Sequence, residues 1–144
     1  KDINIMYHFS CDSCHVATDR ASIERVLINL IQNAVKFTSN GGKIVLSVKR
    51  NDNNVLVSVA DNGIGIASDE LPFVFERFYK ADKSRGLDKK GTGLGLAITK
   101  SIIEAHGQTI KVVSKINEGT KFTFTLQRKG NSDFCCEKRV GRDK

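Results

Sequence analysis

The sequence predicts an α/β (α+β) two-layer sandwich, in which three helices pack on one face of a mixed β-sheet. Two observations support this prediction. Apolar and polar residues alternate in several short segments, and two longer segments repeat apolar residues at the spacing of one helical face. In chain order the expected elements are a strand, a helix, two strands, a short helix, a loop, a helix and two strands.

The N-terminal part of the chain predicts a strand followed by a long helix. Ile3 to Phe9 alternates apolar and polar residues, which is typical of a half-buried strand. Asp19 or Ser22 can cap the helix that follows. Its apolar face contains Ile23, Val26, Leu27, Leu30, Ile31, Ala34 and Val35. The helix should end near Ser39, because Asn40, Gly41 and Gly42 are turn residues.

The middle of the chain predicts a β-hairpin and then a long loop. Lys43–Arg50 and Asn54–Asp61 alternate on either side of the turn sequence NDNN. A short helix is expected near Ser68–Phe75, with Pro72 in its first turns. Residues 76–93 are rich in charge and show no clean period, which predicts a mobile loop.

The last part of the chain predicts a second long helix and a second hairpin. The helix begins near Leu94 and ends at His106 and Gly107, and the hairpin strands are Thr109–Ser114 and Thr120–Leu126. Residues 128–144 lack any periodicity. We therefore expect one domain over residues 1–127, followed by a basic, disordered tail.

The composition is that of a soluble globular protein, with 40% hydrophobic and 27% charged residues. No apolar run approaches the ~20 residues needed to span a bilayer, and no signal peptide is visible at Lys1. The net charge is +7, and residues 128–144 contribute six Lys or Arg against three acids. This excess can attract an anion or can simply be a solvated surface. No aromatic and basic stripe is present, so no nucleic-acid partner is expected.

The cysteines do not predict a cofactor site. CDSCH, from Cys11 to His15, matches the c-type haem attachment pattern, but no export route or haem-sized pocket is indicated. No second ligand pair has the spacing of a zinc site. We expect reduced thiols.

Three segments within 68 residues carry the functional signal: NLIQNAVKF from Asn29 to Phe37, DNGIGI from Asp61 to Ile66, and GTGLGL from Gly91 to Leu96. In the first segment Asn29, Asn33 and Lys36 project from one side of the predicted helix. Alone they would be read as a solvated face. An amide oxygen is also a suitable ligand for Mg²⁺, which prefers hard oxygen donors.

The second segment follows a predicted strand. The Asp61 carboxylate can accept a hydrogen bond from an adenine amino group, and Gly63 and Gly65 allow a base to approach the main chain. Ile64 and Ile66 add an apolar wall. The alternative is an ordinary Asp-Asn-Gly turn.

The third segment precedes a helix, so its glycine amides and the helix N-terminus predict a phosphate site. It is not a Walker A loop, because no GK[ST] follows, and no strand leads into it as in a Rossmann fingerprint. Residues 80–90 of the preceding loop carry five basic residues, which suit a lid over a triphosphate or a solvated loop: Lys80, Lys83, Arg85, Lys89 and Lys90.

Together these segments resemble the N, G1 and G2 boxes of the GHKL superfamily. PFVFERFYKADKS, from Pro72 to Ser84, resembles the F box of bacterial sensor histidine kinases, which gyrase-type, MutL-type and chaperone-type members lack. The resemblance covers residues 1–127 and is to the catalytic ATP-binding domain of those kinases. It implies a Bergerat-type fold, with an ATP lid between the second and third helices.

The resemblance also implies a set of site residues, with ATP and Mg²⁺ as cofactors. Asn33 is the implied Mg²⁺ ligand, Lys80 reaches the terminal phosphate, and both are the implied catalytic residues. Asp61 is the implied adenine anchor. The implied ATP-binding residues are Asn29, Asn33, Lys36, Phe37, Asp61, Gly63, Gly65, Ile66, Tyr79, Lys80, Gly91, Thr92, Gly93, Leu94, Gly95, Leu96 and Thr120.

The implied reaction is transfer of the γ-phosphoryl group from Mg-ATP to a histidine. His8, His15 and His106 lie outside the family's acceptor pattern, so the acceptor is expected on a dimerisation helical hairpin of the same full-length kinase. A response regulator would act downstream. The domain is expected to be cytoplasmic and monomeric, and the full-length kinase to be anchored at the inner face of the cell membrane.

Other classes remain open at this point. They are a gyrase-like or MutL-like ATPase module, a serine kinase of the anti-sigma type, and a pseudokinase that binds nucleotide only as a scaffold. The chain also departs from the family at two turns, with Gln108 and Asn117 where glycines are usual. A left-handed turn would strain Gln108, whereas Asn117 tolerates one.

Overall fold

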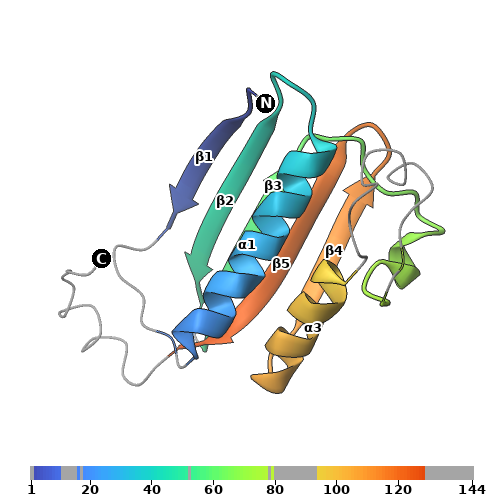
Figure 1. The fold of residues 1–144 in the computed structure, drawn as a ribbon. Coiled ribbons are helices and arrows are strands. Elements are labelled where there is room, and N and C mark those ends of the chain that lie inside the picture. The colour runs from blue at the N-terminus through green and yellow to red at the C-terminus, as the bar shows by residue number, and fades with distance from the viewer. Residues whose placement is uncertain are drawn as a thin grey trace.

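The structure is a computed structural model, and it describes residues 2–10, 16, 18–51, 53–77, 79 and 94–128. The described residues form five strands, two α-helices and one 3₁₀ helix (Figure 1). In chain order these are β1 (Asn4–Phe9), α1 (Arg20–Phe37), β2 (Lys43–Arg50), β3 (Asn54–Asp61), η1 (Leu71–Phe73), α3 (Gly95–Ala105), β4 (Ile110–Lys115) and β5 (Gly119–Gln127).

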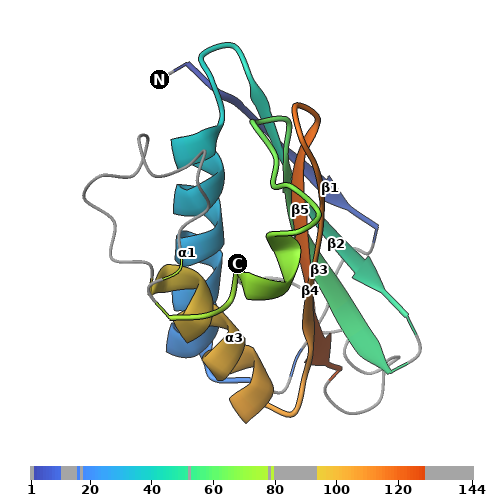
Figure 2. The ribbon, with the colours of Figure 1, turned by 90° about the vertical axis from the view of Figure 1, so that its right-hand side faces the viewer.

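The strands form one mixed sheet, as the sequence predicts, and their order in it is β1-β2-β3-β5-β4. β1 pairs with β2 in parallel, and the other three pairs are antiparallel. The parallel pair requires a crossover, which α1 provides, whereas short hairpin turns join the antiparallel neighbours β2–β3 and β4–β5. Both α-helices lie on the same side of the sheet, so the expected two-layer sandwich is confirmed (Figure 2).

The core forms where the apolar faces of the two layers meet. α1 buries Val26, Leu30 and Ala34, which recur at the spacing of one helical face. The opposing strands contribute Ile44, Val55, Val59, Phe122, Phe124 and Leu126, and α3 contributes Ile103. The Phe75 ring packs edge-on against Phe122, with centroids 5.9 Å apart, so core packing is the role of Phe75.

The N-terminus of α1 follows the capping prediction. The Asp19 carboxylate accepts hydrogen bonds from the Ser22 amide at 3.1 Å and the Ser22 hydroxyl at 2.6 Å. The Ser22 hydroxyl and amide together lower the pKa of Asp19. At the other end, the buried Thr38 donates its hydroxyl to the Ala34 carbonyl at 2.6 Å, and the helix stops at Phe37. This is close to the predicted end at Ser39.

A glycine cap ends α3. It explains how the chain accommodates Gln108, one of the two turn positions where the family usually has glycine. Gly107 takes the left-handed conformation, with φ of +72°. Its amide donates to Glu104 and the Gln108 amide donates to Ile103, which is the Schellman arrangement. Gln108 is therefore unstrained, because Gly107 occupies the left-handed position. Asn117, with φ of +66°, takes the other left-handed turn, as its residue type permits.

One expectation about local structure is confirmed only in part, and another is wrong. The helix expected over Ser68–Phe75 is only the 3₁₀ turn η1, in which Pro72 lacks the amide that a continuing helix needs. β1 is a strand, but all six of its residues are exposed rather than half-buried. It is one of the two edge strands of the sheet, and α1 lies over the middle strands instead (Figure 1). None of the described helices is long and apolar enough to cross a membrane.

Two phenylalanines on this sheet should differ sharply in their contribution to stability. Phe124 is 0% exposed, whereas Phe9 is 62% exposed. We expect Phe124→Ala to lower the free energy of unfolding by about 3–5 kcal/mol, because it removes a buried ring and leaves a cavity. Phe9→Ala, the matched control, should change it by less than about 0.5 kcal/mol. Urea unfolding measures both, and similar losses would contradict the described core.

Candidate functional site

The candidate site is built around the carboxylate of Asp61, the last residue of β3. Its Oδ1 accepts a hydrogen bond from the Gly63 amide at 2.8 Å, and the Thr120 amide donates a second. Desolvation by burial raises the pKa of Asp61 above its ordinary value, and the two amides oppose this shift without cancelling it. A half-buried carboxylate is thus held in one orientation at the end of the sheet.

The loop after Asp61 is held from two sides, and its glycines are required for this. A Cβ at Gly63 would lie 2.2 Å from the Phe37 carbonyl oxygen, at the end of α1. Gly65 has φ of +76°, and a Cβ there would lie 2.0 Å from the Lys115 carbonyl oxygen, at the end of β4. The Ile64 amide donates to Phe37 at 3.2 Å, and its carbonyl accepts from Asn117 at 2.8 Å.

Ser114 is a residue of the site that the sequence reasoning missed. Its hydroxyl accepts a hydrogen bond from the Ile66 amide at 2.8 Å and donates to the Gly119 carbonyl at 2.8 Å. The Thr120 hydroxyl lies 2.8 Å away, so one hydroxyl joins the loop to the β4–β5 hairpin. The available signal was its place in β4, on the same face as the apolar Ile110 and Val112.

Thr120 lies directly beside Asp61, because the two residues are partners in the β3–β5 register. Its side chain is 8% exposed, and its hydroxyl belongs to the Ser114 network. The structure therefore brings together Asp61, Gly63, Gly65, Ile66 and Thr120. Phe37 joins them through its carbonyl, which contacts the loop.

One side of α1 faces the first turn of α3. The Asn29 amide nitrogen donates to the Gly95 carbonyl at 3.4 Å and to the Thr99 hydroxyl at 3.3 Å. Thr99 is fully buried and donates in turn to Gly95 at 2.9 Å. Asn33, one turn further along α1, is half-buried. The predicted side that carries Asn29 thus adjoins the N-terminus of α3.

The other predicted site residues lie near the C-terminus of α1, near the N-terminus of α3, or outside the described residues. The Lys36 ammonium lies 5.8 Å from the centroid of the Phe37 ring. Leu94 is the N-cap of α3 and makes no side-chain capping bond, and Leu96 packs partly buried against the core. Lys80, Gly91, Thr92 and Gly93 lie outside the described residues, as do Cys11, Cys14 and His15.

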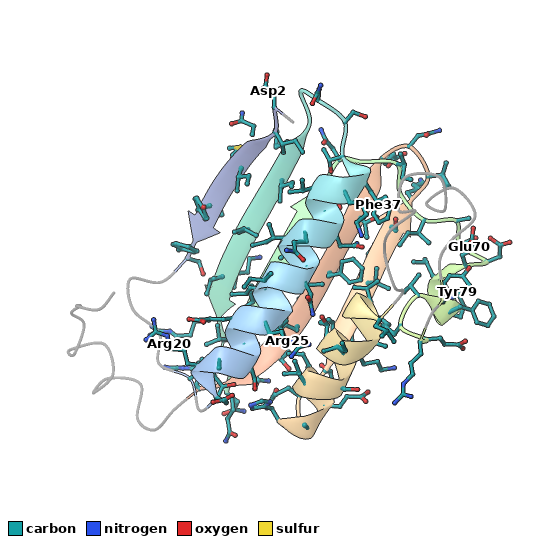
Figure 3. All side chains as sticks on the ribbon, viewed as in Figure 1. Asp2, Arg20, Arg25, Phe37, Glu70 and Tyr79 are labelled. Atoms are coloured by element: carbon teal, nitrogen blue, oxygen red, sulfur yellow. The ribbon has the colours of Figure 1, made fainter. Side chains whose placement is uncertain are left out.

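Tyr79 contacts the segment around η1. Its hydroxyl donates to the Glu70 carboxylate at 2.5 Å, and its ring lies 6.0 Å from that of Phe73 in η1. Figure 3 shows Tyr79 beside Glu70 and well separated from Phe37. Its predicted contact with nucleotide stays a prediction.

The described residues contain no group of three or more His, Cys, Asp or Glu side chains that could hold a metal ion. The amide oxygen of Asn33 is a hard oxygen donor of the kind that Mg²⁺ accepts in proteins.

Comparison with known proteins gives a match over most of the chain. The family described as histidine kinase-, DNA gyrase B-, and HSP90-like ATPase matches residues 18–130. The sensor protein SrrB of Staphylococcus aureus is 39% identical over 126 residues, which are 88% of this chain and 21% of SrrB. The chain therefore spans about a fifth of the length of this relative.

Solved structures of histidine kinases share the fold. The mycobacterial sensor histidine kinase MprB has a TM-score of 0.79 at 28% identity, over 88% of this chain and 84% of that one. Full-length ShkA in complex with AMPPNP has a TM-score of 0.75 at 31% identity, over 88% and 26%. Histidine kinase ThkA in complex with the response regulator protein TrrA has a TM-score of 0.73 at 30% identity, over 88% and 34%.

Burial of Asp61 should make stability depend on pH. Its pKa is raised in the folded state, so the protonated form is favoured there, and this contribution is lost as the pH rises through the folded pKa. We expect the free energy of unfolding of the wild type to fall, relative to Asp61→Asn, as the pH rises from about 4 towards neutral. Urea unfolding at several pH values measures this difference.

Asp69→Asn, which neutralises an exposed aspartate, is the matched control for the loss of one carboxylate. If the free energy of unfolding of the wild type minus that of Asp61→Asn stays constant with pH, or increases as the pH rises, the assigned cause of the shift is contradicted.

Proposed function

The chain belongs to the histidine kinase-, DNA gyrase B-, and HSP90-like ATPase family, and we propose that it donates the γ-phosphoryl group of Mg-ATP to a histidine on another domain of the same kinase. It is an ATP-binding catalytic domain of the histidine-kinase type, since its relatives are sensor histidine kinases. The acceptor is proposed to lie on a dimerisation helical hairpin that this chain does not contain.

The observation that carries the proposal is the fixed carboxylate of Asp61. Two backbone amides hold it, and the surrounding loop is held between the end of α1 and the β4–β5 hairpin. An acceptor of fixed direction at the end of a half-buried wall can select the amino group of adenine. Glycine at 63 and 65 keeps the main chain of the loop free of side chains.

The phosphate end is proposed to lie between α1 and the start of α3. Asn29 joins these two helices, and Asn33 and Lys36, further along the same side of α1, would lie on the approach to the N-terminus of α3. Helix N-terminal amides favour anions. Lys36 would pair with the phosphates, and Gly91, Thr92, Gly93 and Lys80 would complete the phosphate contacts.

Asn33 would hold Mg²⁺ through its amide oxygen, and the bound ion would neutralise charge on the phosphates. The donor fits this cation, since an amide oxygen is a hard ligand and Mg²⁺ usually takes few protein ligands beside water and phosphate oxygens. Phosphoryl transfer depends mainly on positioning and charge. The residues of this chain would therefore bind and orient ATP, while the acceptor histidine supplies the nucleophile.

A hydrolase of the gyrase or MutL type is the second candidate, and Asn29 argues against it. In those ATPases a glutamate one helical turn before the metal-binding Asn activates water, and here that position is Asn29. A neutral amide cannot serve as a general base, and this one already donates its NH₂ to α3. We therefore propose a site that retains ATP until an acceptor docks.

The parent protein is proposed to act in a two-component system. Its partners would be the histidine hairpin and a response regulator, and the histidine kinase ThkA offers a precedent because it has been solved with a response regulator protein. We propose a cytoplasmic, monomeric catalytic domain within a kinase anchored at the inner face of the cell membrane.

Mg-ATP should stabilise the isolated chain. Ligand at 100 times its dissociation constant adds about 2.7 kcal/mol, which should raise the melting temperature by roughly 5–15 °C for a domain of this size. Mg-AMPPNP is the control for turnover and should give a similar rise. A melting curve unchanged by millimolar Mg-ATP would contradict nucleotide binding.

The chain alone should bind ATP without labelling itself or hydrolysing ATP quickly. No histidine of the chain lies in an acceptor pattern, and Asn29 replaces the general base. With radiolabelled ATP, label should appear only after a separately made histidine-hairpin domain from the same kinase is added, and only on that domain.

Replacement of the acceptor histidine in the hairpin by Gln is the control and should abolish labelling. Rapid release of phosphate by the chain alone would favour the hydrolase. Nucleotide binding without any transfer to the hairpin would favour a pseudokinase scaffold.

A further inference from the structure

The back face of the sheet, which is the face turned away from the helices, collects the lysines of the strands. Side chains alternate along a strand, so the pairing register assigns each residue to one face. Ile44, Val59 and Phe122 define the helix face, and their register partners share it. All five strand lysines then fall on the back face, and all are exposed: Lys43, Lys49, Lys111, Lys115 and Lys121.

No acidic residue of the strands lies on the back face. Asp61 is the only Asp or Glu in the five strands, and its register partners place it on the helix face. The ion pairs recorded within the described part of the chain are Arg20–Glu24 and Lys100–Glu104, and both lie on helices. The back face therefore carries positive charge that no strand carboxylate offsets.

The same face is not covered by any described helix or strand. Figure 2 shows α1 and α3 on the other side of the sheet. Two exposed apolar side chains lie on the same face as the lysines. The pairing register places Met6 and Val113 on the back face, and these residues are 45% and 70% exposed. The face thus combines spread positive charge with isolated exposed aliphatic groups on a broad surface.

Nucleic acid, an acidic protein or an anionic bilayer could match this charge, and the chemistry of the face distinguishes them. Single-stranded nucleic acid is bound largely by aromatic stacking, but the aromatic residues of the strands, such as Tyr7, Phe9 and Phe122, lie on the helix face. A duplex or an acidic protein would be expected to meet a focused cluster or arginine forks. Here the cations are lysines on β2, β4 and β5.

We propose that the back face is a docking surface for an anionic lipid bilayer. Dispersed lysines bind a planar negative surface through additive charge attraction, and Met6 and Val113 can enter the headgroup layer. Because Asp61 and the two helices lie on the opposite face, a chain docked in this way keeps its nucleotide site directed away from the membrane. The proposal is independent of the phosphoryl-transfer function.

Vesicle flotation with the full 144-residue chain tests the proposal. The probes are phosphatidylcholine vesicles with and without about 30% phosphatidylglycerol, at about 0.1 M and about 0.5 M salt. The test variant is Lys111→Gln with Lys121→Gln. The matched control is Arg25→Gln with Arg77→Gln, which removes the same charge from exposed positions outside the sheet. A third variant, Lys111→Arg with Lys121→Arg, keeps the charge.

We expect the wild type to bind anionic vesicles at low salt, and to bind neither neutral vesicles nor anionic vesicles at high salt. The double glutamine variant should bind roughly 30-fold more weakly. The arginine variant and the control should stay within about twofold of the wild type. All four chains carry the same basic tail, so its contribution cancels, and melting curves verify that each variant is folded.

Several outcomes would overturn the proposal. These are absence of wild-type binding to anionic vesicles, an equal loss in the Arg25 and Arg77 control, or binding that ignores salt. Parallel titrations with a DNA duplex and with polyglutamate complete the test. Tighter, lysine-dependent binding to either polymer than to vesicles would assign the face to nucleic acid or to an acidic protein instead.

Discussion

The geometry of the candidate site depends on how little space surrounds the loop after β3. The carbonyl oxygens of Phe37 and Lys115 approach Gly63 and Gly65 so closely that a Cβ would lie 2.2 and 2.0 Å from them. A third contact sets the same limit from β5, since a Cβ at Gly119 would lie 1.9 Å from the Asp61 carbonyl oxygen. A methyl group at any of these positions would force the two contacting segments to shift.

The packing of the core therefore also determines the geometry of the site. The apolar stripe of α1 fixes this helix on the sheet, and the end of the same helix then supplies the carbonyl that holds the loop. A polar side of α1 meets α3 through Asn29 and Thr99. Close-packed interiors transmit small displacements. A change in the packing of α1 would therefore displace residues at both the proposed adenine end and the proposed phosphate end.

Local sequence patterns predicted most of the fold, because they report which residues a single helix or hairpin must bury. The strands Lys43–Arg50 and Asn54–Asp61 and the Asp19 cap match the structure for this reason. The burial of β1 was wrong, because a strand's place at the edge of the sheet depends on strand order, which alternation does not report. The role of Ser114 was missed for a similar reason, since its partner Ile66 is 48 residues away. Gln108 is not strained, because the neighbouring Gly107 takes the left-handed conformation at this turn.

The central claim is that the held carboxylate of Asp61 recognises the adenine of ATP, and calorimetric titration of Asp61→Ala tests it most directly. The variant and the wild type are each titrated with Mg-ATP and with Mg-triphosphate, and Asp69→Ala serves as the control for loss of a carboxylate. The account predicts that Asp61→Ala loses about 1–3 kcal/mol of affinity for ATP, whereas its affinity for triphosphate is unchanged. Equal losses for the two ligands would show that Asp61 supports the fold of the loop and does not read the base.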